Sequence, residues 1–140
     1  MNFYAVIDTN VPVSAMLKPG SIPDKIIDHA LHGKIIPVLN EEFLTEYKEV
    51  LSRPKFKNSP EKVEKFLSEI IARGRFVEAK DFEDELPDPK DVIFYHVVLT
   101  AREDVDAYLV TGNLKHFPIK PFVVTPREML DIIERDGDAD

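Results

Sequence analysis

Five short apolar segments alternate with helical patterns along this chain, and that alternation limits the possible folds more than any other feature. The segments are residues 3–7 (FYAVI), 35–39 (IIPVL), 75–79 (RFVEA), 107–111 (AYLVT) and 122–124 (FVV). They are rich in aromatic and β-branched residues, which predicts strands. Because strands separated by helices form βαβ units, we expect an α/β fold with a mainly parallel central sheet of about five strands, flanked by helices on both faces.

The segments between the strands carry helix start and stop signals. Amphipathic stretches over residues 21–33, 40–52 and 59–74 each begin with a serine or asparagine that can act as an N-cap. Residues 90–103 include the run VIFYHVVLTA, which predicts a helix buried deep in the domain. A last helix is expected after residue 125, where Thr-Pro provides a cap and a first helical residue.

Length and composition limit the class of protein. The chain has 140 residues, a formal charge of −8 and no cysteine, so disulfides, iron–sulfur clusters, thiolate zinc sites and a cysteine nucleophile are excluded. We expect one domain over residues 1–135 and an acidic tail over 136–140. No apolar run is long enough for a bilayer and the first residues lack a secretory signal, so a cytoplasmic protein without membrane association is expected.

Several polar residues are expected at the edge of the sheet where parallel strands end, the usual place for a functional crevice. Asp8 directly follows the first strand, and Thr111 and Asn113 end or follow the fourth. Asp91 lies at the head of the buried helix, where a carboxylate must find a cation, a metal or water. Glu46 lies at the border of the apolar sector of its helix. Each also has a purely structural explanation, as a cap, a turn residue or a solvated rim carboxylate.

The remaining residues suggest no other chemistry. The four histidines, His29, His32, His96 and His116, show no metal-ligand spacing, so each is expected at the surface or an interface rather than as a ligand. The chain also lacks a glycine-rich phosphate-binding motif and the GxSxG motif of serine hydrolases.

The motifs VIDTN, EEFLTEYKEVL, LPDPKDVIFYHVV and AYLVTGNLKHFP occur in the order seen in the PIN-domain ribonuclease family, which this chain resembles over about residues 3–130. The resemblance identifies Asp8, Glu46 and Asp91 as the three acids. It makes Thr9 and Asn10 hydrogen-bonding companions of the first acid. The catalytic and supporting residues that it implies are Asp8, Glu46, Asp91 and Asn113, with Thr9, Asn10 and Thr111 holding them in place.

The resemblance implies a PIN-like domain that cleaves phosphodiester bonds of single-stranded RNA with Mg²⁺ or Mn²⁺. Asp8 and Asp91 would be direct metal ligands, and Glu46 a ligand or a base that orients water. Position 113 is Asn where many of these nucleases have Asp, and an amide adds no negative charge. The chain looks closest to toxin components of toxin–antitoxin systems related to VapC, which implies a cognate antitoxin protein as partner and a homodimer.

Charge is uneven along the chain. Residues 51–75 contain seven basic and three acidic side chains, a balance of 7 − 3 = +4, whereas residues 78–91 contain two lysines and seven acids, a balance of 2 − 7 = −5. Arg53, Lys55 and Lys57 in the basic stretch could steer an RNA backbone toward the acids.

Two other functions are compatible with these residues. One is a PIN-like module that binds RNA or a protein partner with weak or no cleavage, for which Asn113 and the net charge argue. The other is a phosphoaspartyl enzyme of the haloacid-dehalogenase type, which also has Asp after its first strand. That enzyme needs a second acid two residues later, where this chain has Asn10.

Overall fold

Five parallel strands form the centre of the molecule in the order β3-β2-β1-β4-β5. The computed structural model describes residues 2–139, and only the backbone of residues 137–139. The strands are β1 (Phe3–Ile7), β2 (Ile35–Leu39), β3 (Arg75–Phe76), β4 (Ala107–Val110) and β5 (Val123–Val124). The chain thus leaves β1 toward one edge of the sheet and later returns to its other side at β4, so the strand order reverses between these two strands.

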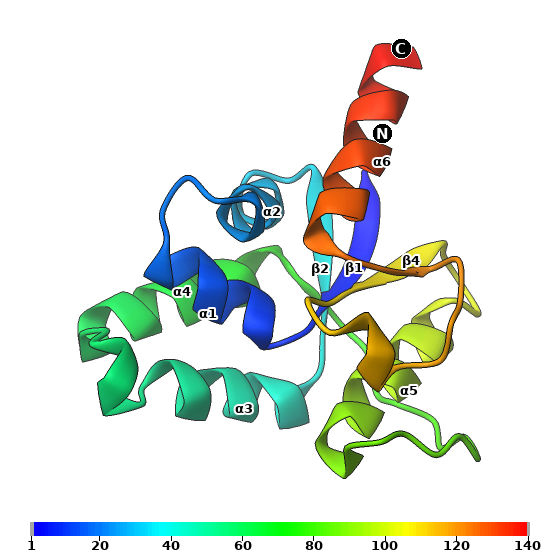
Figure 1. Ribbon diagram of the computed structural model, residues 1–140, viewed down its shortest axis with the longest axis horizontal. Helices are drawn as coiled ribbons and strands as arrows, with labels where there is room; N and C mark the ends of the chain where they lie inside the picture. The colour runs from blue at the N-terminus through cyan, green and yellow to red at the C-terminus, as the bar shows by residue number, and fades with distance from the viewer. Residues whose placement is uncertain (1, 140) are drawn as a thin grey trace.

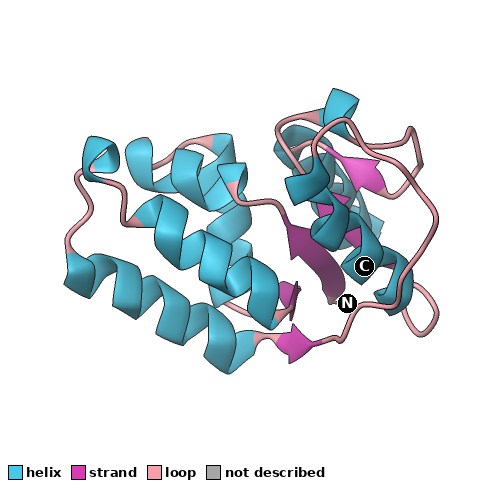
Figure 2. Ribbon diagram, turned by 90° about the horizontal axis from the view of Figure 1, so that it is seen from below, coloured by secondary structure: helices cyan, strands magenta, loops and turns pink. Residues whose placement is uncertain are grey.

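Six α-helices flank the sheet, α1 to α4 on the left of the strands in Figure 1 and α5 on the right. Figure 2 shows the same two groups of helices with the strands between them. The helices are α1 (Asn10–Leu17), α2 (Ile22–Leu31), α3 (Glu41–Leu51), α4 (Pro60–Arg73), α5 (Val92–Ala101) and α6 (Pro126–Ala139). Three short 3₁₀ helices lie in the connections: η1 (Pro54–Phe56), η2 (Pro89–Asp91) and η3 (Leu114–His116). The predicted fold class, an α/β domain with a parallel sheet, is confirmed.

The helix caps follow the sequence signals. Ser21, Asn40 and Ser59 each accept a backbone hydrogen bond at the start of α2, α3 and α4. At the start of α6, Thr125 and Glu128 each accept a hydrogen bond from the other's backbone N–H, the reciprocal arrangement of a capping box. Helix α6 continues through residues 136–139, part of the segment where an acidic tail is expected.

Strand β3 is shorter than predicted, with two residues instead of five. Its partner β2 ends at Leu39. The carbonyl of Leu39 accepts a backbone hydrogen bond from the N–H of Val77 at 2.8 Å. Asn40 then turns the chain into α3, and its side chain donates to the carbonyl of Val77 at 3.0 Å. The chain after Val77 therefore has no neighbouring strand with which to pair.

Helix α1 was not predicted. Its sequence, NVPVSAML, is apolar without a helical period and contains a proline, so pattern and propensity give no helix signal. Thr9 stands at the N-cap position, but its side chain makes no capping hydrogen bond, because its hydroxyl bonds Glu46 instead. The Thr9 side chain thus contacts Glu46 on α3 and does not cap α1.

The core joins the elements that carry the candidate site residues. The rings of Phe43 on α3 and Phe94 on α5 stack with their centroids 4.7 Å apart, and both side chains are almost fully buried. Such pairs contribute about 0.5–1.5 kcal/mol beyond their buried area. This contact fixes α3, which carries Glu46, against α5, which Asp91 precedes. Within residues 2–139, no helix has both the length and the apolar character that crossing a bilayer requires.

Candidate active site

The candidate site lies where β1 and β4 end, at the point where the strand order reverses. The backbone N–H of Asp8 donates to the carbonyl of Val110 at 2.9 Å, so the residues that follow the two strands start side by side. Asp8 follows β1, and Thr111 follows β4. The chain between them includes α3 and η2, which bring Glu46 and Asp91 to the same edge.

Asp8 is a buried carboxylate held by two side chains. The residue is 6% exposed, and its Oδ2 accepts hydrogen bonds from the Thr111 hydroxyl at 2.8 Å and the Asn10 side-chain amide at 3.1 Å. Burial raises the pKa of Asp8 to about 6; the Thr111 hydrogen bond opposes this shift, and the negative charges of Asp91 and Glu46 add to it. The site therefore holds a carboxylate that is costly to ionise without a cation nearby.

Glu46 is fixed by Thr9, whose hydroxyl donates a hydrogen bond to its Oε2. The neighbouring Tyr47 is buried and donates its hydroxyl to the backbone carbonyl of Ile7 at the end of β1. Burial raises the pKa of Tyr47 well above its usual value, so this hydroxyl keeps its proton. The two bonds attach α3 to the end of β1 and place Glu46 beside the segment that carries Asp8.

Asp91 lies at the end of η2, and its side chain is 14% exposed. Its Oδ2 is 3.2 Å from Nδ1 of His116 in η3. Burial and the charge of Asp88 raise the pKa of Asp91, whereas His116 lowers it. Asp88 itself caps η2 by accepting the backbone N–H of Lys90 at 2.9 Å, the structural role that its position before a proline indicates.

The prediction that all four histidines lie at the surface or an interface is wrong for His96. His116 is 40% exposed, as a surface residue, and its ring contacts Asp91. His96 is buried on α5, where its ring packs edge-on against Phe82 with the centroids 5.4 Å apart, and its Nε2 has no hydrogen-bond partner among the described residues. The sequence signal that was available for His116 is its place three residues after Asn113, in the turn that follows the fourth strand.

The loop after β4 is joined to Asn10, so the supporting residues form one network. The side-chain oxygen Oδ1 of Asn10 accepts the backbone N–H of Gly112 at 3.1 Å, while the side-chain Nδ2–H of Asn10 donates to Asp8. The backbone N–H of Asn113 donates to the Thr111 hydroxyl at 3.0 Å. The Asn113 side chain is exposed and takes part in none of the hydrogen bonds found among the described residues. The structure thus brings Asn10 and Thr111 onto Asp8 but leaves the Asn113 carboxamide outside this network.

An acidic groove of about 1070 Å³ opens beside Glu46, between the start of α3, the segment after β3 and the start of α5. One lysine and five carboxylates line it: Lys90, Glu41, Glu42, Glu46, Glu78 and Asp81. An anionic ligand in this groove would meet strong repulsion without a cation.

The basic residues expected to steer RNA do not line this groove. Arg53, Lys55 and Lys57 belong to the η1 connection, which follows the end of α3 at Leu51. Arg53 is within 3.8 Å of Glu49, and the Lys55 ammonium lies over the Phe56 ring.

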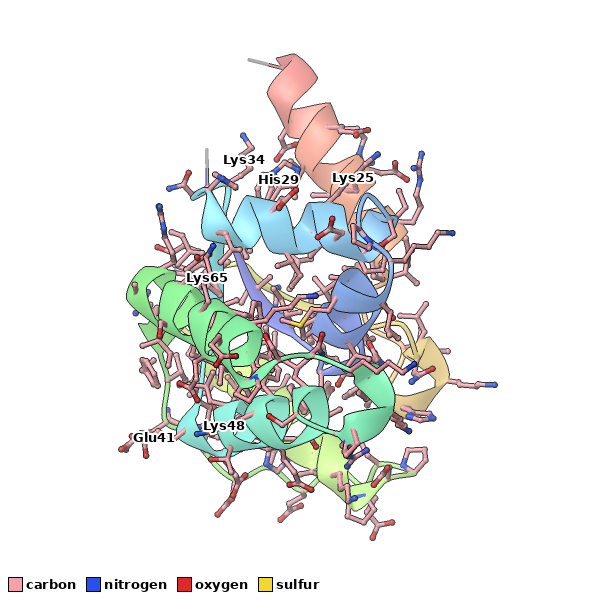
Figure 3. The ribbon with its side chains drawn as sticks, turned by 90° about the vertical axis from the view of Figure 1, so that its left-hand side faces the viewer. Lys25, His29, Lys34, Glu41, Lys48 and Lys65 are labelled. Atoms are coloured by element: carbon pink, nitrogen blue, oxygen red, sulfur yellow. The ribbon has the colours of Figure 1, made fainter. Side chains whose placement is uncertain are left out.

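On the outer face of α3 and α4, Lys48 and Lys65 are visible (Figure 3). Each of these lysines lies near a glutamate, Lys48 within 3.2 Å of Glu64 and Lys65 within 4.0 Å of Glu69. The positive charges of these two lysines are therefore partly balanced by the neighbouring glutamates.

The donor set suits a hard divalent cation, although its members do not converge. Carboxylate and amide oxygens are the ligands that Mg²⁺ and Mn²⁺ prefer, and Asp8, Glu46 and Asp91 lie close enough for the charges of the other two to raise the pKa of Asp8. Among the salt bridges of the described residues, none joins Asp8 or Glu46 to a lysine or arginine. Over the same residues, no three acidic or histidine side chains meet closely enough to enclose one ion.

Of three comparisons with known proteins, the one with protein families gave a match. A search of the curated proteins gave no match, and neither did a search of the solved structures. The family model described as PIN domain matches residues 4–115, which are 115 − 4 + 1 = 112 of the 140 residues. This segment contains all the strands and helices that bring Asp8, Glu46 and Asp91 together. The chain therefore belongs to the PIN domain family, whose members are generally nucleases and usually use divalent metals.

Proposed function

We propose that this chain is a metal-dependent endoribonuclease that cleaves phosphodiester bonds of single-stranded RNA. The observation that carries the proposal is the buried Asp8 carboxylate, fixed by Thr111 and Asn10 and surrounded by the charges of Glu46 and Asp91. Such a group is costly in a protein that only needs to fold, because a neutral side chain of the same shape would avoid the loss of hydration. A perturbed carboxylate at the carboxyl edge of a parallel sheet is typical of an active site.

The residues that would hold Mg²⁺ or Mn²⁺ are Asp8, Asp91 and Glu46, with the Asn113 amide as an outer contact. A bound divalent cation would polarise the phosphate and lower the pKa of an attacking water. Neighbouring side chains orient the carboxylates of Asp8 and Glu46. Thr111 and Asn10 both bond Oδ2 of Asp8, and Thr9 bonds Oε2 of Glu46. Each of these side-chain contacts engages one oxygen of its carboxylate. Oε1 of Glu46 would orient the water and take up its proton.

The substrate and partners rest on the resemblance to PIN-domain toxins. In this proposal the chain is the toxin component of a toxin–antitoxin system, acts on RNA in the cytoplasm, forms a homodimer and is inhibited by a cognate antitoxin. Lys55 and Lys57 on the η1 connection, with Arg53, would attract the RNA backbone from outside the acidic groove.

A second candidate is a PIN-like module that binds RNA or a protein partner without cleaving. Two observations favour it: the carboxylates of the described residues do not meet around one point, and the Asn113 side chain stays outside the network of the site. In that case the acids would be a remnant of a catalytic site and their removal would leave binding unchanged.

Cleavage of a fluorescent single-stranded RNA separates the two candidates. We expect the wild type to cut in Mn²⁺ and to stop when EDTA removes the metal. Asp8→Asn, which keeps the size of the side chain, should slow cleavage about 100-fold or more. Asp28→Asn, an exposed acid on α2, is the matched control and should cut like the wild type. RNA binding without cleavage by the wild type would favour the second candidate, and equal cleavage by wild type and Asp8→Asn would contradict the proposed site.

A further inference from the structure

His116 reaches the candidate site from a part of the chain that supplies none of the acids. It ends η3, and its Nδ1 lies 3.2 Å from Oδ2 of Asp91, 25 residues earlier in the sequence. The Asp91 side chain is 14% exposed and that of His116 is 40% exposed. The imidazole therefore lies on the solvent side of a carboxylate that is mostly covered.

The three acids differ in what fixes their side chains. Asp8 is held by Thr111 and Asn10, and Glu46 by Thr9. For Asp91, the His116 contact is the one side-chain hydrogen bond found among the described residues. An ionised carboxylate only accepts hydrogen bonds, so the imidazole must be the donor, with its proton on Nδ1.

We propose that His116 is a positioning residue, which donates Nδ1–H to Oδ2 of Asp91 and thereby fixes the orientation of this third acid. The inference rests on the proposed function, since it assigns His116 a part in the same site. This contact engages Oδ2 of Asp91, and Oδ1 takes part in none of the hydrogen bonds found among the described residues. The segment after β4 then serves two acids, Thr111 fixing Asp8 and His116 fixing Asp91.

The hydrogen bond itself is tested without metal or RNA. Long-range ¹H–¹⁵N spectra of the imidazole rings show which nitrogen carries the proton, and they are recorded at alkaline pH, where imidazole is neutral. We expect His116 to carry its proton on Nδ1 in the wild type and to lose that preference in Asp91→Ala. His32, whose Nδ1 lies 2.7 Å from the carbonyl of Asp28 on its own helix, should be unchanged and serves as the internal control. A wild-type His116 with its proton on Nε2 alone would overturn the inference.

The consequence for the site is tested by Mn²⁺ titration calorimetry. His116→Ala should weaken Mn²⁺ binding about 10- to 100-fold, the usual effect of removing a group that orients a metal ligand. His116→Asn places an N–H donor where Nδ1 stands and should restore most of the affinity. Lys115→Ala, an exposed neighbour in the same 3₁₀ helix, is the matched control. Wild-type affinity in His116→Ala, or equal weakening in His116→Ala and His116→Asn, would overturn the positioning role.

Failure of this inference can be distinguished from failure of the proposed function. If the wild type binds Mn²⁺ and cleaves RNA while the His116 variants behave like it, only the role of His116 is refuted. If the wild type does not cleave RNA, the proposed function is refuted, and the proton position on His116 still decides whether this residue holds Asp91.

Discussion

Thr111 donates a hydrogen bond of 2.8 Å to the carboxylate of Asp8, although 103 residues separate them in the sequence. The bond joins the ends of the two central strands, β1 and β4, and it is formed between two buried side chains. It stabilises the ionised form of Asp8 and so lowers a pKa that burial raises. The protonation state of the site thus depends on a residue from the other end of the chain.

Replacing Thr111 by Val should therefore raise the pKa of Asp8 above about 6, since the hydrogen bond that lowers it is lost. The carboxyl ¹³C shift of Asp8, followed by NMR across the acidic range, measures this directly. Thr45→Val is the control, because the Thr45 hydroxyl bonds a carbonyl of its own helix on the exposed side of α3. An Asp8 pKa that is the same in wild type and Thr111→Val would show that the bond contributes nothing.

Asp8→Asn should stabilise the folded protein near neutral pH. The pKa of Asp8 rises from 3.8 to about 6 on folding, so the folded state binds the proton more tightly. The contribution of Asp8 to the unfolding free energy therefore falls as pH rises from 3.8 to about 6, and it is lowest above that range. At 1.36 kcal/mol per pKa unit, the variant gains up to about 3 kcal/mol near neutral pH and little near pH 4.

Urea unfolding of wild type and Asp8→Asn at both pH values measures this difference. Asp28→Asn should change the unfolding free energy by less than about 0.5 kcal/mol at either pH. Equal stability of Asp8→Asn and wild type near neutral pH would mean that the Asp8 carboxylate is not strained by burial.

Tyr47→Phe should destabilise the fold by about 1–3 kcal/mol, because it leaves the carbonyl of Ile7 without its buried donor. Tyr108→Phe is the matched control: Tyr108 is half-buried on β4, and its hydroxyl makes no hydrogen bond within the described residues. That variant should stay within about 0.5 kcal/mol of the wild type in urea unfolding. Similar losses in both variants would argue against a specific role of the Tyr47 bond in holding α3.

Gly74→Ala should also destabilise the fold, through close contact rather than hydrogen bonding. A Cβ at this position would lie 2.2 Å from Cδ1 of Leu39 and 3.1 Å from the carbonyl oxygen of Ile70. Leu39 is fully buried and cannot move aside freely, so we expect a loss of about 1–3 kcal/mol in urea unfolding. At Gly112 the same atom would meet Asn10 at 3.4 Å, an ordinary contact, so Gly112→Ala should lose clearly less. A larger loss of stability in Gly112→Ala than in Gly74→Ala would contradict the close contact between position 74 and Leu39.

The sequence predicts the buried elements well and the site only in part. Strands β1 and β2 have the bounds that their apolar runs predict, because burial on both faces leaves an unambiguous signal. Helix α1 could not be predicted, since its sequence NVPVSAML has no helical period and contains a proline. The end of β3 depends on where its partner β2 stops, a property of the pairing and not of residues 75–79 themselves.

Within the site, too, some residues are recognisable from the sequence and others only from the folded structure. Asp8 is recognisable because it directly follows a buried strand. His116 is not, because its contact with Asp91 arises only when η3 and η2 are folded against the same edge. The motif points to Asn113, yet the structure leaves the Asn113 side chain exposed and places His116, three residues later, against Asp91. A motif identifies the segment, and the fold decides which of its side chains reaches the acids.

In the proposed function, Asp8, Glu46 and Asp91 form one cation-binding site. Mn²⁺ titration calorimetry on the wild type, Asp8→Asn and Asp91→Asn tests it most directly, with Asp28→Asn as the control. We predict that the wild type and the control bind Mn²⁺ and that each of the two site variants loses this binding. A wild type that does not bind even millimolar Mn²⁺, or binding that survives both substitutions, would contradict a shared site.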